Sequence, residues 1–109
     1  MKRLRLDTSS IVDLDSFHTE FSKLLGFPEF YGRNMDAWID CMSYINHPEA
    51  QMSEVTVPNG EPLFLEISDT EAFLARCADM FHEFVICTAF VNQRFLAEGS
   101  ATAICLVLL

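Results

Sequence analysis

The sequence predicts a single α/β domain over residues 1–109, with about four helices packed on a small parallel three-stranded sheet and an added edge strand or hairpin. Three observations predict this class. The length suits one domain, half of the residues are hydrophobic with ten phenylalanines among them, and strand-like segments alternate with helix-like ones. Because strands separated by helices favour parallel pairing through right-handed crossovers, we expect the sheet to be parallel.

The first strand and the first helix follow from residue spacing. Residues 2–7 alternate basic and apolar side chains, as a half-buried strand does. A helix is expected to begin at Asp15 or Ser16, either of which can cap it, and to end at Gly26. Apolar residues recur between these bounds at the spacing of one helix face.

Residues 27–45 are the most distinctive stretch. The chain is expected to turn at Gly32 and to begin a second helix capped by Asn34, whose side-chain oxygen can accept from free backbone N–H groups. On that helix Asp36 and Asp40 lie four residues apart on one side. Like charges so placed repel each other, so helix stability does not explain the pair.

A hairpin is predicted after this helix, with Val55–Val57 as an edge strand, a turn at Asn59-Gly60 and Leu63–Ile67 as a central strand. The second arm is taken as central because it is the more apolar. This added edge strand is the feature that distinguishes the expected sheet from a minimal three-stranded one.

The last third of the chain predicts two helices and a strand. Ser68 and Glu71 have the spacing of a capping box, and the helix they open is expected to break near Asp79. Residues 81–97 are so apolar that the following helix is expected to be largely buried. Residues 101–108 predict a final strand that is buried on both faces.

The central stretch resembles the signature of the barstar-like family, the intracellular inhibitors of barnase-type ribonucleases. The matching residues are Pro28-Glu29-Phe30-Tyr31-Gly32, then Asn34, Asp36-Ala37 and Asp40-Cys41. The resemblance implies a barstar-like α/β domain that is not an enzyme. It would bind a basic ribonuclease or related nuclease toxin in the cytoplasm, as an immunity protein, and block the active site with an acidic helix.

The resemblance implies that Asp36 and Asp40 bind the partner. A carboxylate on a rigid helix can occupy the site where a ribonuclease holds the scissile phosphate, provided that neither aspartate is buried or already paired with Arg or Lys. Neighbouring residues would exclude water from this charged centre. They are Phe30, Tyr31, Asn34, Met35, Ile39, Ser43 and Tyr44. For Tyr31, an exposed contact and a cover for the loop are both open, whereas Trp38 is expected in the core.

Several positions differ from the pattern of the best-known family members. Those have a tyrosine at Phe30, an acidic residue at Arg33 and a tryptophan at Ile39, and they place an acid on the last helix near Asn92-Gln93-Arg94. Two acid-to-base changes at a site for a basic partner indicate a toxin other than barnase, or a lost inhibitory role.

The charge balance bounds the partner. Seven basic and 16 acidic residues give a net charge of −9, which disfavours nucleic acid and anionic membranes and attracts a basic protein. The same excess of acid also keeps small proteins soluble. The apolar runs at residues 84–91 and 103–109 are shorter than a membrane span, and the basic start lacks the apolar run of a signal peptide. A cytoplasmic location is therefore expected.

The sequence predicts no metal site, cofactor site or disulfide framework. The four cysteines and three histidines have no paired spacing, and there is no glycine-rich phosphate loop. Two further functions are considered: an enzyme that uses Asp36 and Asp40 as acid–base or Mg²⁺ groups, and an assembly or adaptor module that pairs through residues 54–57. The sequence does not determine the oligomeric state.

Overall fold

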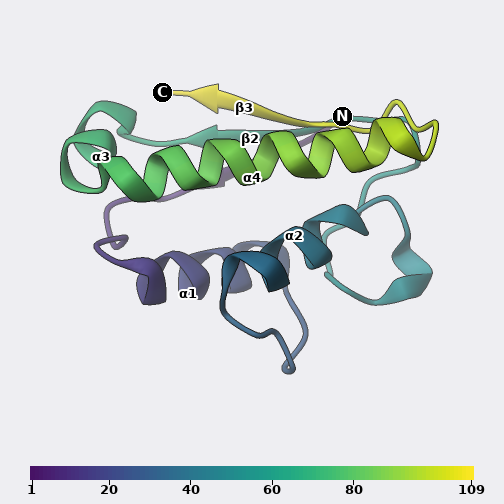
Figure 1. Ribbon diagram of the computed structural model, residues 1–109, viewed down its shortest axis with the longest axis horizontal. Coiled ribbons are helices and arrows are strands. Elements are labelled where there is room, and N and C mark those ends of the chain that lie inside the picture. The colour runs from purple at the N-terminus through teal and green to yellow at the C-terminus, as the bar shows by residue number, and fades with distance from the viewer.

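A computed structural model describes all of residues 1–109 and confirms the α/β architecture with four α-helices and a three-stranded parallel sheet (Figure 1). In chain order the elements are β1 (Lys2–Leu6), α1 (Leu14–Leu25), α2 (Met35–Ser43), the short 3₁₀ helix η1 (Pro48–Ala50), β2 (Leu63–Ile67), α3 (Thr70–Arg76), α4 (Ala78–Ala97) and β3 (Ile104–Leu108). The strand order is β1-β2-β3, so β2 is central as predicted.

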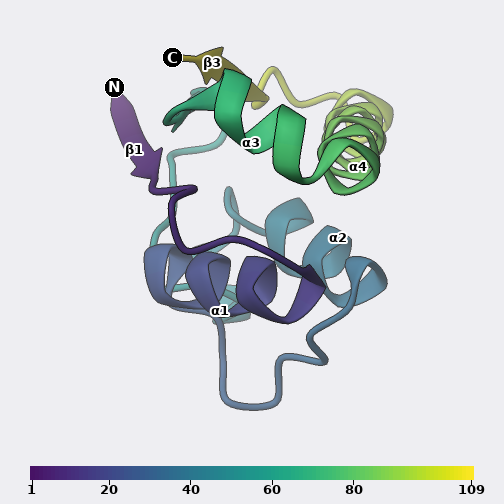
Figure 2. The ribbon, with the colours of Figure 1, turned by 90° about the vertical axis from the view of Figure 1, so that its left-hand side faces the viewer.

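The helices lie on one side of the sheet, as Figure 2 shows when the strands are viewed nearly end-on. The burial pattern of β2 agrees with this arrangement. Leu63, Leu65 and Ile67 are fully buried, whereas Phe64 and Glu66 between them point to the opposite face and are partly exposed. Alternate residues of a strand point to opposite faces, so the sheet has one packed face and one face without a helical layer.

An aromatic cluster joins three of the helices in the core. Phe17 and Phe21 of α1, Trp38 of α2 and Phe84 of α4 are all fully buried. Their ring centroids lie between 4.8 and 5.8 Å apart. The prediction that Trp38 packs in the core is confirmed. The cluster fixes α2 between α1 and α4, so the outer face of α2 is held on a rigid base.

The ends of α1 agree with the sequence at one terminus and differ at the other. The cap is Asp13 and not Asp15 or Ser16, since the Asp13 carboxylate accepts a hydrogen bond from the Ser16 N–H at 2.8 Å. The Ser16 hydroxyl oxygen accepts in return from the Asp13 N–H at 3.1 Å. This reciprocal capping box begins the helix earlier than expected. The predicted end is confirmed, because Gly26 has a left-handed φ of +69°.

The predicted capping box before α3 is wrong. The Ser68 hydroxyl accepts from the Thr8 N–H at 3.0 Å and so joins the end of β2 to the segment after β1. Asp69 precedes the helix without a side-chain capping bond. The break between α3 and α4 lies at Cys77, two residues before the predicted position at Asp79. The serine that the spacing marks as a helix cap instead forms a tertiary hydrogen bond.

The predicted edge strand at Val55–Val57 is wrong, and no hairpin forms. The N–H groups of Glu54 and Val55 both donate to the Leu25 carbonyl at 3.0 Å, and the Val57 N–H donates to the Ile45 carbonyl at 2.9 Å. The segment therefore packs across the ends of α1 and α2. Val57 is buried in the core, and the segment does not pair with β2.

Two predictions of deep burial are also wrong. In α4 only one face is buried, and Val85, Ile86, Phe90 and Leu96 are 38–64% exposed. In β3 only Ile104 is fully buried, because this strand is at the margin of the sheet and not inside it. None of the helices has the length and apolarity needed to span a membrane.

Candidate partner-binding site

Helix α2 presents two aspartates to solvent from a firmly anchored backbone. The Asn34 side chain caps the helix, accepting from the Ala37 N–H at 2.8 Å as predicted. Trp38 and Met42 are fully buried on the inner face, and Asp36 and Asp40 are exposed on the outer face. Because a capped and packed helix loses little entropy on binding, it holds these carboxylates ready for a partner.

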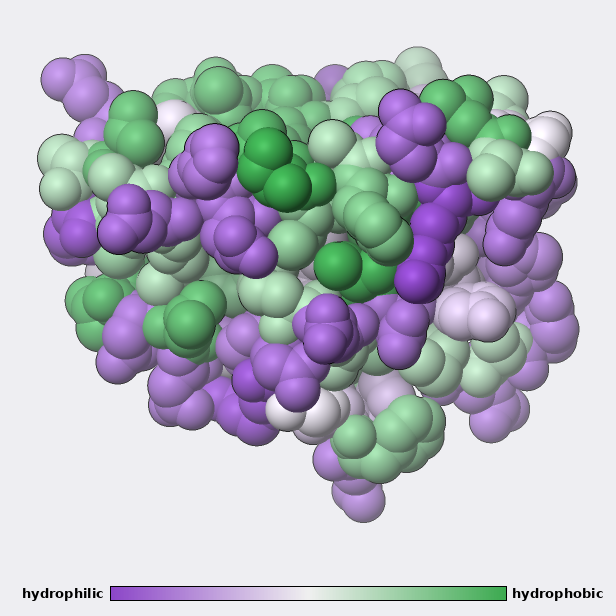
Figure 3. Space-filling model, viewed as in Figure 1, coloured by the Kyte–Doolittle hydropathy of each residue, from purple (hydrophilic) through white to green (hydrophobic).

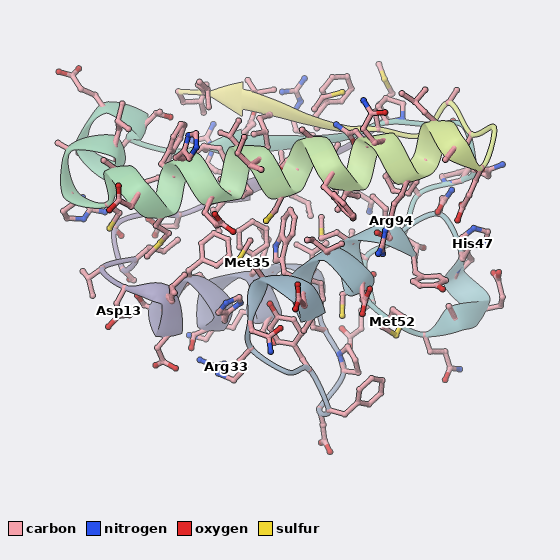
Figure 4. The ribbon with its side chains drawn as sticks, in the orientation of Figure 1. Asp13, Arg33, Met35, His47, Met52 and Arg94 are labelled. Carbon is pink, nitrogen blue, oxygen red and sulfur yellow. The ribbon has the colours of Figure 1, made fainter.

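Asp40 is not free. Its Oδ1 atom lies 3.2 Å from Nη1 of Arg94, a side chain that reaches from α4 toward α2 (Figure 4). The expectation that both carboxylates are unpaired is therefore wrong for Asp40. Arg94 also lies 3.4 Å from the Ser43 hydroxyl, and its guanidinium is 5.1 Å from the centre of the Phe90 ring. Asp36 forms no ion pair in the structure, so it carries the uncompensated charge of this face.

Arg94 stands between two shallow depressions. The first, of about 360 Å³, is lined by Asp36, Ile39, Asp40, Phe90 and Arg94. The second, of about 340 Å³, is lined by Ser43, Tyr44, Arg94, Ala97 and Glu98. The site is therefore formed by α2 and α4 together. Sequence reasoning missed Phe90 and treated Arg94 only as the place of an absent acid, although their spacing of four residues puts them on one flank of α4.

Tyr31 covers the loop and does not contact solvent as a binding residue would. It is 8% exposed, and its hydroxyl oxygen lies 2.6 Å from Nδ1 of His18 on α1. Burial raises the pKa of Tyr31 above its ordinary value. Burial, with the Arg33 charge as a smaller cause, lowers the pKa of His18. Both shifts favour the neutral forms at pH 7, so the contact is a hydrogen bond between an uncharged imidazole and an uncharged phenol. The neighbouring Phe30, at 75% exposure, is the accessible aromatic of this loop.

Arg33 stabilises the loop and does not join the acidic face. It has a left-handed φ of +54°, and its Nη2 atom donates to the Asp15 carbonyl, the Asp15 carboxylate and the Thr19 hydroxyl at 2.8–2.9 Å. The Asp15 carboxylate balances its charge. The expected effect of Arg33 on a basic partner stays a prediction, and this internal ion pair weakens it.

The remaining predicted residues divide between support and contact. Ser43 is 8% exposed and its hydroxyl donates to the Ile39 carbonyl at 2.6 Å, so it supports the helix. Met35 and Ile39 are half-buried, and Tyr44 is 45% exposed. A narrower groove of about 160 Å³ lies between the loop and α2. At its base Cys41 is 2% exposed, and burial raises the pKa of its thiol to about 11.

The structure groups no three His, Cys, Asp or Glu side chains as a metal site would require, and all four cysteines are free thiols. The α2 face presents one unpaired carboxylate, one carboxylate with an internal counter-ion, and exposed aromatic rings around them.

Comparison with known proteins gives two findings. A family model described as "Barstar (barnase inhibitor)" matches residues 1–107. A protein of Bacillus subtilis (strain 168), named "Putative ribonuclease inhibitor YrdF", is 33% identical over 43 residues, which are 39% of this chain and 47% of that protein. The match thus spans about half the length of this relative.

Proposed function

Because the chain belongs to the barstar family, we propose that it binds a basic ribonuclease and blocks the active site of that enzyme with the outer face of α2. Family membership and the named relative support a barnase-inhibitor-like role, and the α/β architecture is consistent with it. The observation that carries the proposal is the exposure of Asp36 and Asp40 on a helix fixed by the aromatic core.

The proposed mechanism is substitution of a phosphate by a carboxylate. A ribonuclease active site collects cationic side chains around the scissile phosphate, and a carboxylate can take the place of that anion. Asp36 is free to do so. Phe30, Ile39, Tyr44 and Phe90 surround the carboxylates with apolar surface, which excludes water and strengthens the charge interactions at the centre.

Arg94 gives Asp40 an internal counter-ion that the partner has to replace. The pair is open to solvent, with 59% of the Asp40 side chain and 43% of the Arg94 side chain exposed. Exposed ion pairs contribute about 0–1 kcal/mol, so a cation of the ribonuclease can displace Arg94 at small cost. Arg94 then selects against partners that bring positive charge to its own position.

The net charge of −9 supports fast association with a basic enzyme, since long-range attraction steers the encounter. We place this activity in the cytoplasm, where an immunity protein would hold a nuclease toxin inactive. We propose only the class of the toxin, which is a basic ribonuclease or a related nuclease.

Barnase and basic ribonucleases isolated from the source organism are suitable probes. We expect one-to-one inhibition of at least one of them, with an association rate that falls steeply with salt. Asp36→Ala and Asp40→Ala should each weaken binding by about tenfold or more, whereas Glu71→Ala, an exposed acid on α3, should change it less than about twofold. Equal small losses in all three variants, or no inhibition of any probe, would overturn the proposal.

A further inference from the structure

The outer edge of β3 has unpaired backbone groups. The Leu63 N–H donates to the Ala103 carbonyl, and the Leu109 N–H donates to the Ile67 carbonyl, both across the β2–β3 ladder. The backbone N–H and C=O groups of the odd-numbered residues at β3 therefore point toward β2. Because the direction alternates along a strand, Leu106 and Leu108 turn their N–H and C=O groups away from the sheet, where the structure provides no partner for them.

This edge lacks the charges that usually protect a free strand. β3 reads Ile-Cys-Leu-Val-Leu, without a charged side chain, and Leu108 is 55% exposed. The other free edge belongs to β1, which carries Lys2, Arg3 and Arg5. Charged side chains on an edge strand discourage pairing with another chain, so β1 is protected and β3 is not.

Helix α4 extends this apolar surface beside β3. Asn92 marks the flank of α4 that faces the strand, since its side chain donates to the Ile104 carbonyl at 3.0 Å and accepts from the Ile104 N–H at 2.8 Å. Val85, Ala89 and Leu96 lie on the same flank at helical spacing and are exposed. Figure 3 shows hydrophobic residues gathered over α4 and toward the margin where β3 lies. A further strand beside β3 would pack against this flank.

We propose that two copies of this chain pair through their β3 edges, antiparallel about a two-fold axis, so that two three-stranded sheets become one. Leu106 of one copy lies opposite Leu108 of the other and exchanges both N–H···O bonds with it. The axis passes between the two Val107 residues. Asn92 already occupies the edge groups of Ile104, which confines the ladder to Leu106 and Leu108 and so sets the register.

Charge and symmetry favour a second copy as the occupant. Two chains of net charge −9 repel each other, so a stable contact between them has to avoid carboxylates. The β3 edge from Ile104 to Leu108 and the α4 residues Val85, Ala89 and Leu96 contain no ionisable group except the half-buried thiol of Cys105. A two-fold contact requires a self-complementary surface, and this apolar strip beside a free ladder is one.

The dimer leaves the α2 face accessible. Arg94 contacts α2 from one flank of α4, whereas Asn92 contacts β3 from the other. Each copy therefore keeps its partner-binding site, and pairing through β3 is independent of ribonuclease binding.

Sedimentation velocity of the full chain tests the proposal. We expect the weight-average mass to rise from 12.4 kDa toward twice that value as concentration increases from about 1 µM to about 1 mM. Because both copies are acidic, added salt should strengthen the dimer, the opposite of its effect on ribonuclease binding. Leu108→Lys should raise the dissociation constant by about tenfold or more, since it buries an unpaired charge at the edge. Val12→Lys changes the net charge equally at a 64% exposed apolar position in the segment between β1 and α1, and should leave the constant within about twofold.

Hydrogen exchange gives a second readout that does not depend on a variant. The amides of Leu106 and Leu108 should exchange more slowly as the dimer forms, and those of Arg3 and Arg5, on the outer edge of β1, should not change. A mass fixed at 12.4 kDa at every concentration would overturn the proposal. The same result is expected if this edge instead binds an extended peptide of another protein. A dimer without protection at Leu106 and Leu108, or one weakened equally by both lysines, would overturn it as well.

Discussion

The Nδ1 atom of His18 lies 2.6 Å from the phenolic oxygen of Tyr31, and this buried contact fastens the loop before α2 to α1. His18 and Tyr31 are only 2% and 8% exposed, so neither can contact a partner directly. Their effect on the acidic face is therefore indirect. By fixing the loop, they fix where α2 begins and hence where its aspartates point.

The first prediction concerns pH. The folded protein holds the pKa of His18 below its ordinary value of 6.5 through burial and the nearby Arg33 charge. As pH falls, the unfolded chain takes up the proton first, so the free energy of unfolding decreases. The His18 contribution is complete above pH 6.5 and is lost as pH falls through the lower folded pKa. Urea unfolding between pH 8 and pH 5 should show this loss for the wild type and a flatter profile for His18→Gln.

Phe27→Leu is the control for this measurement. Phe27 packs on Tyr31 with ring centroids 4.6 Å apart, so the variant loosens the same loop without removing an ionisable group. It should lower stability at every pH and keep the wild-type slope. If His18→Gln kept that slope too, the assignment to His18 would be incorrect.

The second prediction concerns the contact between Gly26 and the segment that replaced the expected strand. A Cβ atom on Gly26 would lie 2.7 Å from the Cβ of Glu54, and the residue also has φ of +69°. Gly99 has a similar φ of +74° with open space around it. Gly99→Ala should therefore cost about 1–2 kcal/mol, from backbone strain alone. Gly26→Ala should cost measurably more in denaturant unfolding, and Glu54→Gly should recover part of the difference.

The third prediction separates the two faces of α4. Phe84 is fully buried in the aromatic cluster, and Phe90, six residues along and therefore on another face of the helix, is 50% exposed. Phe84→Ala should lower the free energy of unfolding by about 3–5 kcal/mol. Phe90→Ala should lower it by no more than about 1 kcal/mol, the size of its exposed contact with Arg94. Comparable losses in thermal or denaturant unfolding would contradict the orientation of α4.

The fourth prediction concerns the counter-ion of Asp40. Arg94→Met keeps most of the aliphatic stem and removes the charge that lies 3.2 Å from Asp40. Stability should change by less than about 1 kcal/mol, while association with a basic ribonuclease should become faster. Lys23→Met removes one positive charge from α1, where the lysine is 72% exposed. Stopped-flow rates that rise equally in both variants would show an effect of net charge alone.

Local signals predicted the elements whose own residues decide them. The Asn34 cap and the Gly26 terminus are local choices of backbone geometry, and both are confirmed. Leu63–Ile67 is the more apolar arm, which predicts the central strand. The strand order confirms this. The predicted exposure of Asp36 and Asp40 also follows from the position of Trp38 on the opposite side of the helix.

Signals failed where distant residues decide the outcome. Val55–Val57 has the pattern of a strand, yet its amides are satisfied by the carbonyl groups at the ends of two helices. The Asp40–Arg94 pair joins positions 54 residues apart, and no local spacing predicts it. The prediction that α4 is largely buried is wrong, because composition alone does not show that only one face of this helix packs on the core.

The strand order has a consequence during translation. Leu63 pairs with Lys2 on one side and with Ile104 on the other, so a ribosome delivers the middle strand long before its second neighbour. A chain that ends before residue 104 leaves the outer edge of β2 unpaired, and an unpaired edge strand of leucine and isoleucine can pair with another chain.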